Sequence, residues 1–488
     1  MKKKEAAPSI KMNFIMNAIL TLSSVIFPLI TFPYASRILL PEGMGKVSFA
    51  TSFIAYFCMF AQMGIPTYGI RACAKVRDDK EELTKTAQEL LIMNLVMSAA
   101  VYAVLFLVLI CIPRFRAERT LYMLVSVTIF LNAIGMEWLY KALEQYRYIT
   151  IRSVFFKFIA VLAMLIFIHK TEDYVIYGGI TIFAASASNI LNFINAHQYI
   201  KMKPVGGYCF KRHMKPVIVF FAMSCATTVY TNLDTVMLGI MTTNTDVGLY
   251  NAAVKIKAVL VGIVTSLGAV LLPRASYYVQ KGNMEEFYNV SKKAVHFIFL
   301  AAVPMMVFFM IYAKPCVLLL SGTAFEGAVL PMQIIMPTLL FIGLSNLLGI
   351  QMLIPLGKEK MVLYSEITGA VVDLLLNYIL IPMYGAAGAA IGTLVAEAVV
   401  LIVQYIALQT EVKSFFREIP YRTIILSVTA GSVASVWILG LKLNSFVTLA
   451  VASGLFFGAY LMVLVWRKEK LLMELLKTYR KETRGERE

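Results

Sequence analysis

The feature that most constrains this chain is its series of long apolar runs. Runs of about 20 mostly apolar residues, the length that crosses a bilayer core, start near residues 13, 43, 88, 119, 148, 174, 214, 246, 291, 328, 361, 386, 421 and 444. Hydrophobic residues make up 59% of the 488 residues, and charged residues make up 15%. A soluble domain could not cover so much apolar surface, so we predict an all-α polytopic membrane protein with about 14 transmembrane helices.

The amino end, MKKKEAAPSIK, precedes an apolar run that is too long for a secretion signal and lacks a small-residue cleavage site. We expect this run to remain as the first transmembrane helix. The six cysteines show neither metal nor disulfide spacing, and the four histidines are dispersed along the chain. We therefore predict packing roles for the cysteines and no metal site.

The net charge of +17 raises the question of a nucleic-acid partner, and the distribution of the charge argues against one. Most Lys and Arg residues lie at the amino end, in the tail and in alternate loops, at 68–87, 141–152, 201–215, 274–293, 358–360 and 411–422. Such loops mark the cytoplasmic side of a membrane protein. We predict a cytoplasmic-membrane protein with both termini in the cytoplasm, no nucleic-acid partner, and a tail along the inner leaflet.

The chain divides into two similar halves. The stretch RILLPEGMGKVSFATSF (37–53) is a fainter copy of the stretch 230–257. Gly45 matches Gly248, and the run of small and aromatic residues after it matches residues 249–253. Repeats that meet at buried charges are typical of transporters with a site near the bilayer midplane. We predict two pseudo-repeated six-helix lobes plus two C-terminal helices, with the following limits: amino end 1–12, first lobe 13–200, linker 201–213, second lobe 214–410, accessory helices 411–466 and basic tail 467–488.

Basic residues inside the apolar runs are candidate contacts for an anionic substrate, because a charge at a helix centre costs about 2.5–3.5 kcal/mol on insertion scales unless a partner offsets it. Lys157 has no nearby acid in sequence. Lys255 is a second candidate, with a structural ion pair to Asp234 as the alternative. Lys257 points to nearly the opposite face from Lys255, and the sequence leaves open which of the two faces a cavity.

Two arginines at the ends of runs complete the candidate anion contacts. Arg37 follows the first run at its outer end, and Arg71 lies at the cytoplasmic end of the second. For both of them, a role in topology or in lipid headgroup contact is the alternative.

Polar residues on shared helix faces form two further candidate sets. In the run 361–383, Glu366, Gly369, Asp373 and Asn377 follow one another at spacings of three, four and four residues and form one polar stripe. We predict ion coupling by H⁺ or Na⁺ at Asp234, Glu366, Asp373 and Glu397, with neutralisation of lysines as the alternative. We predict a polar cavity lining at Asn189, Asn192, Asn377 and Gln404. No catalytic residue and no other cofactor is expected.

Three motifs resemble a known family: FPYASRILLPEGMGKVSFATSF, LDTVMLG with DVGLYNAAVKI, and LLNYILIPMYGAAGAAIGTLVAE. They are similar to the polysaccharide transporter branch, the Wzx-like lipid-linked oligosaccharide flippases, of the multidrug/oligosaccharidyl-lipid/polysaccharide exporter superfamily. The resemblance runs from about Asn13 to Gln409. It implies two six-helix lobes around a cationic cavity. Lys255 and Asn377 match positions of the family, whereas Asp373 departs from its more usual neutral residue.

Flipping of an undecaprenyl-pyrophosphate-linked repeat unit by alternating access, for capsule, O-antigen or exopolysaccharide synthesis, is the leading hypothesis. The implied partners are the lipid-linked oligosaccharide, membrane lipids, and a polysaccharide polymerase and glycosyltransferases. A cation-coupled multidrug antiporter of the same superfamily is the alternative, although a cationic drug would prefer carboxylates to Lys157 and Lys255. A membrane polysaccharide polymerase is disfavoured because every predicted outer loop is short, so we expect a transporter and not an enzyme.

Overall fold

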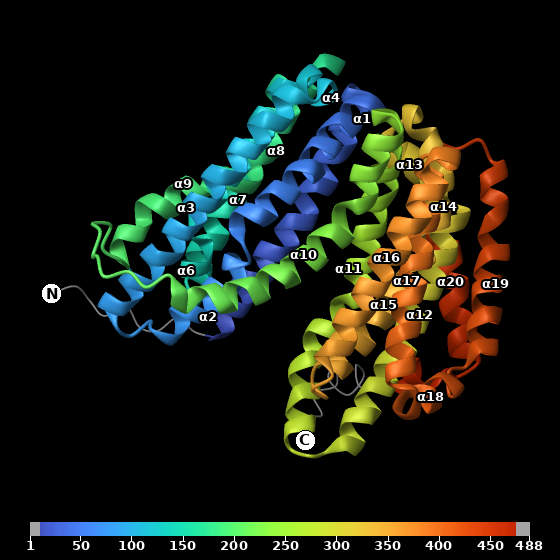
Figure 1. The fold of residues 1–488 in the computed structure, drawn as a ribbon. Coiled ribbons are helices and arrows are strands. Elements are labelled where there is room, and N and C mark those ends of the chain that lie inside the picture. Colours follow the sequence, from blue (N-terminus) through green and yellow to red (C-terminus); the bar gives the residue numbers. More distant parts are fainter. Residues whose placement is uncertain (1–9, 475–488) are drawn as a thin grey trace. The chain divides into compact units, whose positions relative to one another are not determined.

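The computed structural model describes residues 10–474, and the regular structure within this range is helical throughout (Figure 1). The predicted all-α polytopic fold is confirmed. Residues 1–9 and 475–488 contain most of the predicted amino end and tail. Those two predictions lie largely outside the described residues.

The chain forms two compact units that divide after Gly248. The first unit is coloured from blue to green in Figure 1. Its helices are α1 (Ile10–Gln62), α2 (Ile65–Lys75), α3 (Lys80–Cys111), α4 (Pro113–Ala117), α5 (Arg119–Gly135), α6 (Glu137–Ala142), α7 (Tyr146–Phe167), η1 (Thr171–Asp173), α8 (Tyr174–Ile182), the π-helix η2 (Phe183–Ala187), α9 (Ser188–Asn195), η3 (Ala196–Gln198) and α10 (Lys211–Met241).

The second unit begins within α11 and runs to red in Figure 1. Its helices are α11 (Asn244–Gln280), α12 (Met284–Ile311), α13 (Ala313–Ser321), η4 (Thr323–Ala328), α14 (Val329–Ile335), α15 (Thr338–Asn346), the π-helix η5 (Leu347–Leu353), α16 (Glu359–Tyr384), α17 (Ala386–Ala407), α18 (Gln409–Arg417), α19 (Tyr421–Val436), η6 (Trp437–Gly440) and α20 (Ser445–Trp466). Helix α10, which we assign from sequence to the second lobe, packs on α1 and α2 in the first unit. The predicted lobe limits therefore stay a prediction.

Within residues 10–474, eleven helices are long and apolar enough to cross a membrane, or twelve if the bent pair Thr323–Ile335 and Thr338–Leu353 is one span. Two features lower this number relative to the fourteen predicted runs. The stretch Ile15–Lys75 is continuous and counts once, and Arg119–Gly135 is shorter than the other apolar helices. The predicted count of fourteen is not confirmed.

Helix α1 contains two predicted runs and is broken between them. At 1.5 Å per residue, its 53 residues would extend about 80 Å, far beyond a hydrocarbon core of about 30 Å. The break lies at Leu40, with φ 61° and ψ 175°. Pro41 disfavours the helical region for the preceding residue and pushes its ψ to extended values. A leucine at positive φ is strained, and Leu40 is the residue inside α1 whose φ and ψ are not helical.

Gln88 of α3 holds the segment that leads into α10. Its Nε2 donates hydrogen bonds to the carbonyl oxygens of Lys201 (2.6 Å) and Lys203 (2.9 Å). Its Oε1 accepts from the backbone N–H of Val205 (3.2 Å) and from the hydroxyl of Tyr208 (2.7 Å). Each hydrogen-bonding group of the amide is used, so this side chain fixes a segment without regular structure.

The next residue, Glu89, fixes the first turn of α10. Its carboxylate is fully buried and accepts from the backbone N–H of Cys209 (2.6 Å) and from Nε of Arg212 (2.9 Å). His213 lies between this carboxylate and α2, with Nε2 2.7 Å from Glu89 and Nδ1 2.8 Å from the hydroxyl of Tyr68. We call Gln88 and Glu89 with these partners the α3 clamp.

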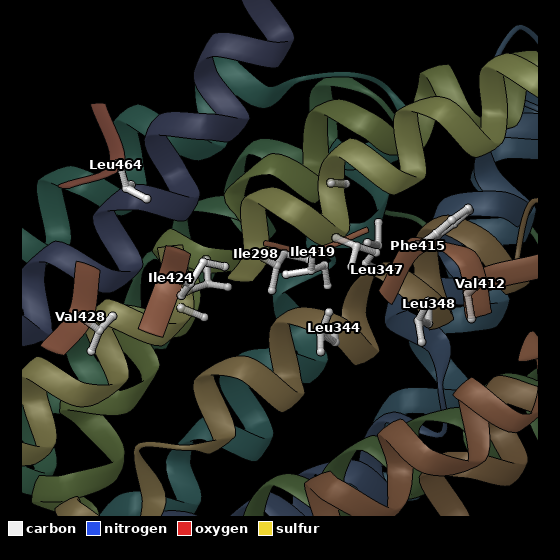
Figure 2. Close-up of a cluster of buried hydrophobic side chains, with 14 of the residues drawn as sticks. Ile298, Leu344, Leu347, Leu348, Val412, Phe415, Ile419, Ile424, Val428 and Leu464 are labelled. Carbon is white, nitrogen blue, oxygen red and sulfur yellow. The ribbon is translucent and has the colours of Figure 1, made fainter. Parts of the chain in front are cut away.

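The second unit contains a large cluster of buried apolar side chains, part of which is shown in Figure 2. Residues of α12, α15 and η5 meet residues of α18, α19 and α20 there, and Ile298, Leu344 and Phe415 are among the labelled side chains. The chain after α20 folds back onto α12. Glu469 is buried, caps the backbone N–H groups of Leu471 and Leu472 at 3.0 and 2.8 Å, and lies 3.1 Å from His296. The last two spans are thereby part of the second unit.

Candidate functional site

The first unit contains a cavity of about 430 Å³ among α1, α2, α5, α8, η2 and α10, within the range typical of small-ligand sites. None of its lining residues is charged. The lining consists of Thr51, Ala55, Cys58, Met59, Gln62, Gly64, Pro66, Val125, Thr128, Asn132, Ile182, Ala185, Ser224, Thr228 and Asn232. We call it the first-unit cavity.

Hydrogen bonds join one wall of this cavity to the helix behind it. The hydroxyl of Ser186, in η2, donates to Oδ1 of Asn132 (3.3 Å), and Oγ1 of Thr128 lies 2.9 Å from Oγ of Ser186. Nδ2 of Asn189 donates to the same Oδ1 of Asn132 (3.1 Å). A Cβ atom on Gly135 would lie 2.4 Å from Cγ of Asn189, so glycine is what lets Asn189 approach α5 this closely. We call Thr128, Asn132, Ser186 and Asn189 the polar wall.

The predicted lining residues Asn189 and Asn192 are both buried and lie outside the set that lines the cavity. Asn189 supports Asn132 from behind, and the backbone oxygen of Asn192 accepts a hydrogen bond from the hydroxyl of Tyr140 (2.5 Å). Sequence reasoning missed Asn132 and Asn232. The available signal was a hydroxyl residue four positions before each of them, which places two polar groups on one helix face.

Lys157 extends from α7 to α1. Its Nζ donates to the hydroxyl oxygens of Ser23 and Ser24, both at 2.9 Å. Ser23 is buried, whereas Ser24 is exposed. Within residues 10–474, no carboxylate lies within 4.0 Å of this ammonium group. The lysine thus has neutral hydrogen-bond partners and keeps its positive charge uncompensated by an ion pair.

The two arginines predicted as anion contacts are exposed. Nη1 of Arg37 donates to the carbonyl oxygen of Pro33 in its own helix (2.5 Å), and Arg71 lies on α2. A third arginine, Arg152, belongs to a predicted loop but is buried in α7, with Nη1 on the carbonyl oxygen of Ser188. In the described residues, Arg152 has no carboxylate within 4.0 Å.

In the second unit, the predicted residues lie on α16 and α17, which pack against each other. Asp373, Asn377, Glu397 and Gln404 are buried, whereas Glu366 is half-buried. Nε2 of Gln404 donates to the hydroxyl of Ser365 (3.0 Å). The amide group of Gln404 therefore joins α17 to α16.

Gly392 of α17 makes room for the oxygen atoms at this interface. A Cβ atom there would lie 2.3 Å from Oδ1 of Asn377 and 3.0 Å from Oδ1 of Asp373. The next residue, Thr393, has its Oγ1 2.8 Å from the hydroxyl of Tyr250. A carboxylate, an amide oxygen and hydroxyl groups are the ligands that hard cations prefer. In the described residues, no three His, Cys, Asp or Glu side chains gather into a metal site.

The remaining predicted residues lie on α10 and α11. Asp234 is buried on α10 in the first unit, and Lys255 is half-buried on α11 in the second. Lys257 is half-buried as well. Their roles in binding and coupling, and the choice between the two lysines, stay predictions.

Comparisons with known proteins bear on this arrangement. The model of the polysaccharide biosynthesis protein family matches residues 10–279, and the MatE model matches residues 220–379. A putative O-antigen transporter of Escherichia coli (strain K12) is 24% identical over 398 residues, which cover 80% of this chain and 95% of the relative.

Two solved structures share the fold at 14% identity. Lipid II flippase MurJ in an inward closed conformation has a TM-score of 0.68, with 93% of this chain and 99% of that chain covered. The inward-facing conformation of a multidrug resistance MATE family transporter of the MOP superfamily has a TM-score of 0.65, with 83% and 99% covered. The resemblance inferred from the motifs is confirmed. Because the family model spans more than half of its length, the chain belongs to the polysaccharide biosynthesis protein family.

Proposed function

We propose that this protein is a flippase that moves a lipid-linked oligosaccharide across the cytoplasmic membrane, with undecaprenyl pyrophosphate as the lipid carrier. The observation that carries the proposal is the first-unit cavity, whose lining combines apolar residues with hydroxyl and amide side chains and contains no charged residue. Hydroxyl and amide side chains suit neutral sugars, which present many hydroxyl groups and no charge. The name of the related putative O-antigen transporter supports the same class of substrate.

Lys157 supplies the second part of the proposal. The diphosphate that joins lipid and sugar is an anion, and a cation whose present partners are hydroxyl groups can exchange them for phosphate oxygens. The cytoplasmic position of both termini, and a functional connection to a polymerase and glycosyltransferases, belong to this proposal.

Reconstitution tests the function directly. The full chain in vesicles is expected to move lipid-linked oligosaccharide, extracted from the source membrane, between the two leaflets. The measurement is the decrease in the amount of sugar that binds a lectin added outside the vesicles, which reaches only the outer leaflet. Protein-free vesicles provide the control. Sugar that remains accessible for the same time with and without protein would contradict the flippase.

A multidrug antiporter is the second candidate, because the MatE model matches residues 220–379. The absence of a carboxylate from the first-unit cavity disfavours a cationic drug there. The same vesicles distinguish the two functions. Extrusion of ethidium without movement of the oligosaccharide would favour the antiporter.

Ion coupling at the α16–α17 interface makes a separate prediction. We expect an imposed H⁺ or Na⁺ gradient to accelerate transport and the substitution Asp373→Asn to remove this response, because a buried carboxylate gains most from a bound cation where water is excluded. The matched control is Glu359→Gln, which neutralises an exposed acid in the first turn of the same helix. A wild-type rate that ignores both gradients would rule out this coupling.

A further inference from the structure

The polar wall has hydrogen-bond directions that its geometry fixes. Oδ1 of Asn132 accepts hydrogen bonds from Ser186 and from Asn189, at 3.3 and 3.1 Å. This oxygen is the acceptor end of the amide, so the Nδ2 group, which can only donate, is the end that remains for the cavity. Asn132 therefore presents a donor.

The same reasoning gives Thr128 the opposite character. Ser186 has one hydroxyl hydrogen, and Asn132 receives it. With that hydrogen directed to Asn132, the hydroxyl of Thr128 is the donor in its 2.9 Å contact with Ser186. Its lone pairs remain for the cavity that it lines, so Thr128 presents an acceptor one helical turn from the donor of Asn132.

Side chains of α10 and α1 add further acceptors. Nδ2 of Asn232 donates to the carbonyl oxygen of Thr228 (3.1 Å) and to Oγ1 of Thr231 (3.0 Å), which leaves Oδ1 of Asn232 for the cavity. The hydroxyl of Thr51 donates to the carbonyl oxygen of Val47 (2.8 Å), which leaves its lone pairs. Acceptors fixed in this way lie on three helices. The donors are the amide group of Asn132 and the side chains of Gln62, Ser224 and Thr228, and none of the lining residues is a cation.

We propose that the first-unit cavity binds a neutral sugar ring through hydroxyl groups that donate to Thr128, Asn232 and Thr51, and that it discriminates against sugar acids and phosphates. A hydroxyl group donates and accepts, so it satisfies both kinds of wall group. A carboxylate or phosphate accepts only, and would place its lone pairs against fixed acceptors without a cation in the lining. This inference rests on the proposed function and names the class of sugar that the site takes.

Ser186 and Asn189 are positioning residues in this scheme. Neither lines the cavity, and both act by holding Oδ1 of Asn132 away from it. Their removal should therefore lower the preference for a neutral over an acidic sugar, which a purely structural role would leave unchanged. Ser186→Ala separates the two roles, because it removes only the hydroxyl group that orders Asn132 and Thr128.

The test measures binding of two probes to the purified full-length protein by calorimetry. One probe is the oligosaccharide released from its lipid carrier by mild acid. The other is the same oligosaccharide after oxidation of its primary hydroxyl groups to carboxylates. We expect the oxidised probe to bind the wild-type protein at least about tenfold more weakly than the neutral probe. The reason is that its carboxylate oxygens would face acceptor groups of the cavity and form no hydrogen bonds with them.

Variants of the polar wall test whether its side chains cause the preference for the neutral probe. Asn132→Asp replaces the donor by an acceptor of the same shape and is expected to weaken binding of the neutral probe at least about tenfold. Thr128→Val removes an acceptor at constant volume and provides a second variant if Asn132→Asp folds poorly. The control, Asn289→Asp, makes the same chemical change at an exposed site of the second unit.

Equal binding of both probes to the wild-type protein, or neutral binding unchanged in Asn132→Asp and Thr128→Val, would overturn this inference while vesicle transport continued. Failure of the wild-type protein to move the lipid-linked molecule would instead contradict the proposed function. An unchanged preference in Ser186→Ala would remove the positioning role.

Discussion

Replacement of Gly45 by alanine is expected to abolish transport and to lower the yield of folded protein. A Cβ atom at this position would lie 1.7 Å from the carbonyl oxygen of Asn244, and one on Gly248 would lie 2.0 Å from the carbonyl oxygen of Pro41. The obstacle is backbone in both cases, so no side chain can rotate away. We expect a cost above the roughly 1–3 kcal/mol of ordinary overpacking.

The measurement compares folded yield, as the monodisperse fraction after size-exclusion chromatography, with polymer export in cells that lack the native chain. The matched control is Gly262→Ala in α11, where a Cβ atom meets nothing within 4 Å. Alanine there favours the helix by about 1 kcal/mol. If Gly45→Ala matched Gly262→Ala in folded yield and in polymer export, the close backbone contact between Gly45 and Asn244 would not be needed for folding or transport.

Lys157→Met is expected to remove most transport while leaving expression normal. The ammonium group contacts two hydroxyl groups and no carboxylate in the described residues, so its removal leaves no buried counter-charge behind. Removal of one partner of a buried ion pair would cost about 3–5 kcal/mol, and that cost does not arise here. The proposed diphosphate contact, however, would lose its cation.

Lys442→Met, at an exposed position, is the matched control for this variant. Lys157→Arg keeps the charge and is expected to retain part of the transport, because arginine also binds phosphate. The retention is partial because its guanidinium group has a different geometry from the ammonium group of lysine. The initial rate in vesicles and the amount of protein in the membrane are measured together. Transport by Lys157→Met at the wild-type rate would make the lysine a structural residue only.

The membrane fold was predictable because a bilayer demands apolar runs of a fixed length, and hydropathy along the chain reports them directly. The number of spans was less predictable. The break in α1 depends on one backbone conformation, at Leu40 before Pro41, within a stretch that stays helical on both sides. Sequence indicates a proline kink there but does not distinguish a bend within one span from a turn between two.

The candidate site was predictable only in part, for a related reason. Helical periodicity tells which residues share a face, so the buried stripe of Gly369, Asp373 and Asn377 could be read from spacing. It does not tell which neighbouring helix that face meets. In the sixth run, the π-helix η2 adds a residue to a turn immediately before Asn189 and rotates the faces of α9 relative to those of α8. Asn189 therefore faces Asn132, and Asn132 lines the cavity.

The α3 clamp restricts how the start of α10 can move. Because Gln88 and Glu89 hold both the segment before α10 and its first turn, the start of α10 must move as one body with α3. Rotation of α10 about this end would break a set of buried hydrogen bonds together, including those of a carboxylate with no exposure. Any bending that α10 undergoes during a transport cycle must then be absorbed further along the helix, beyond His213, where neither Gln88 nor Glu89 has a hydrogen-bond partner among the described residues.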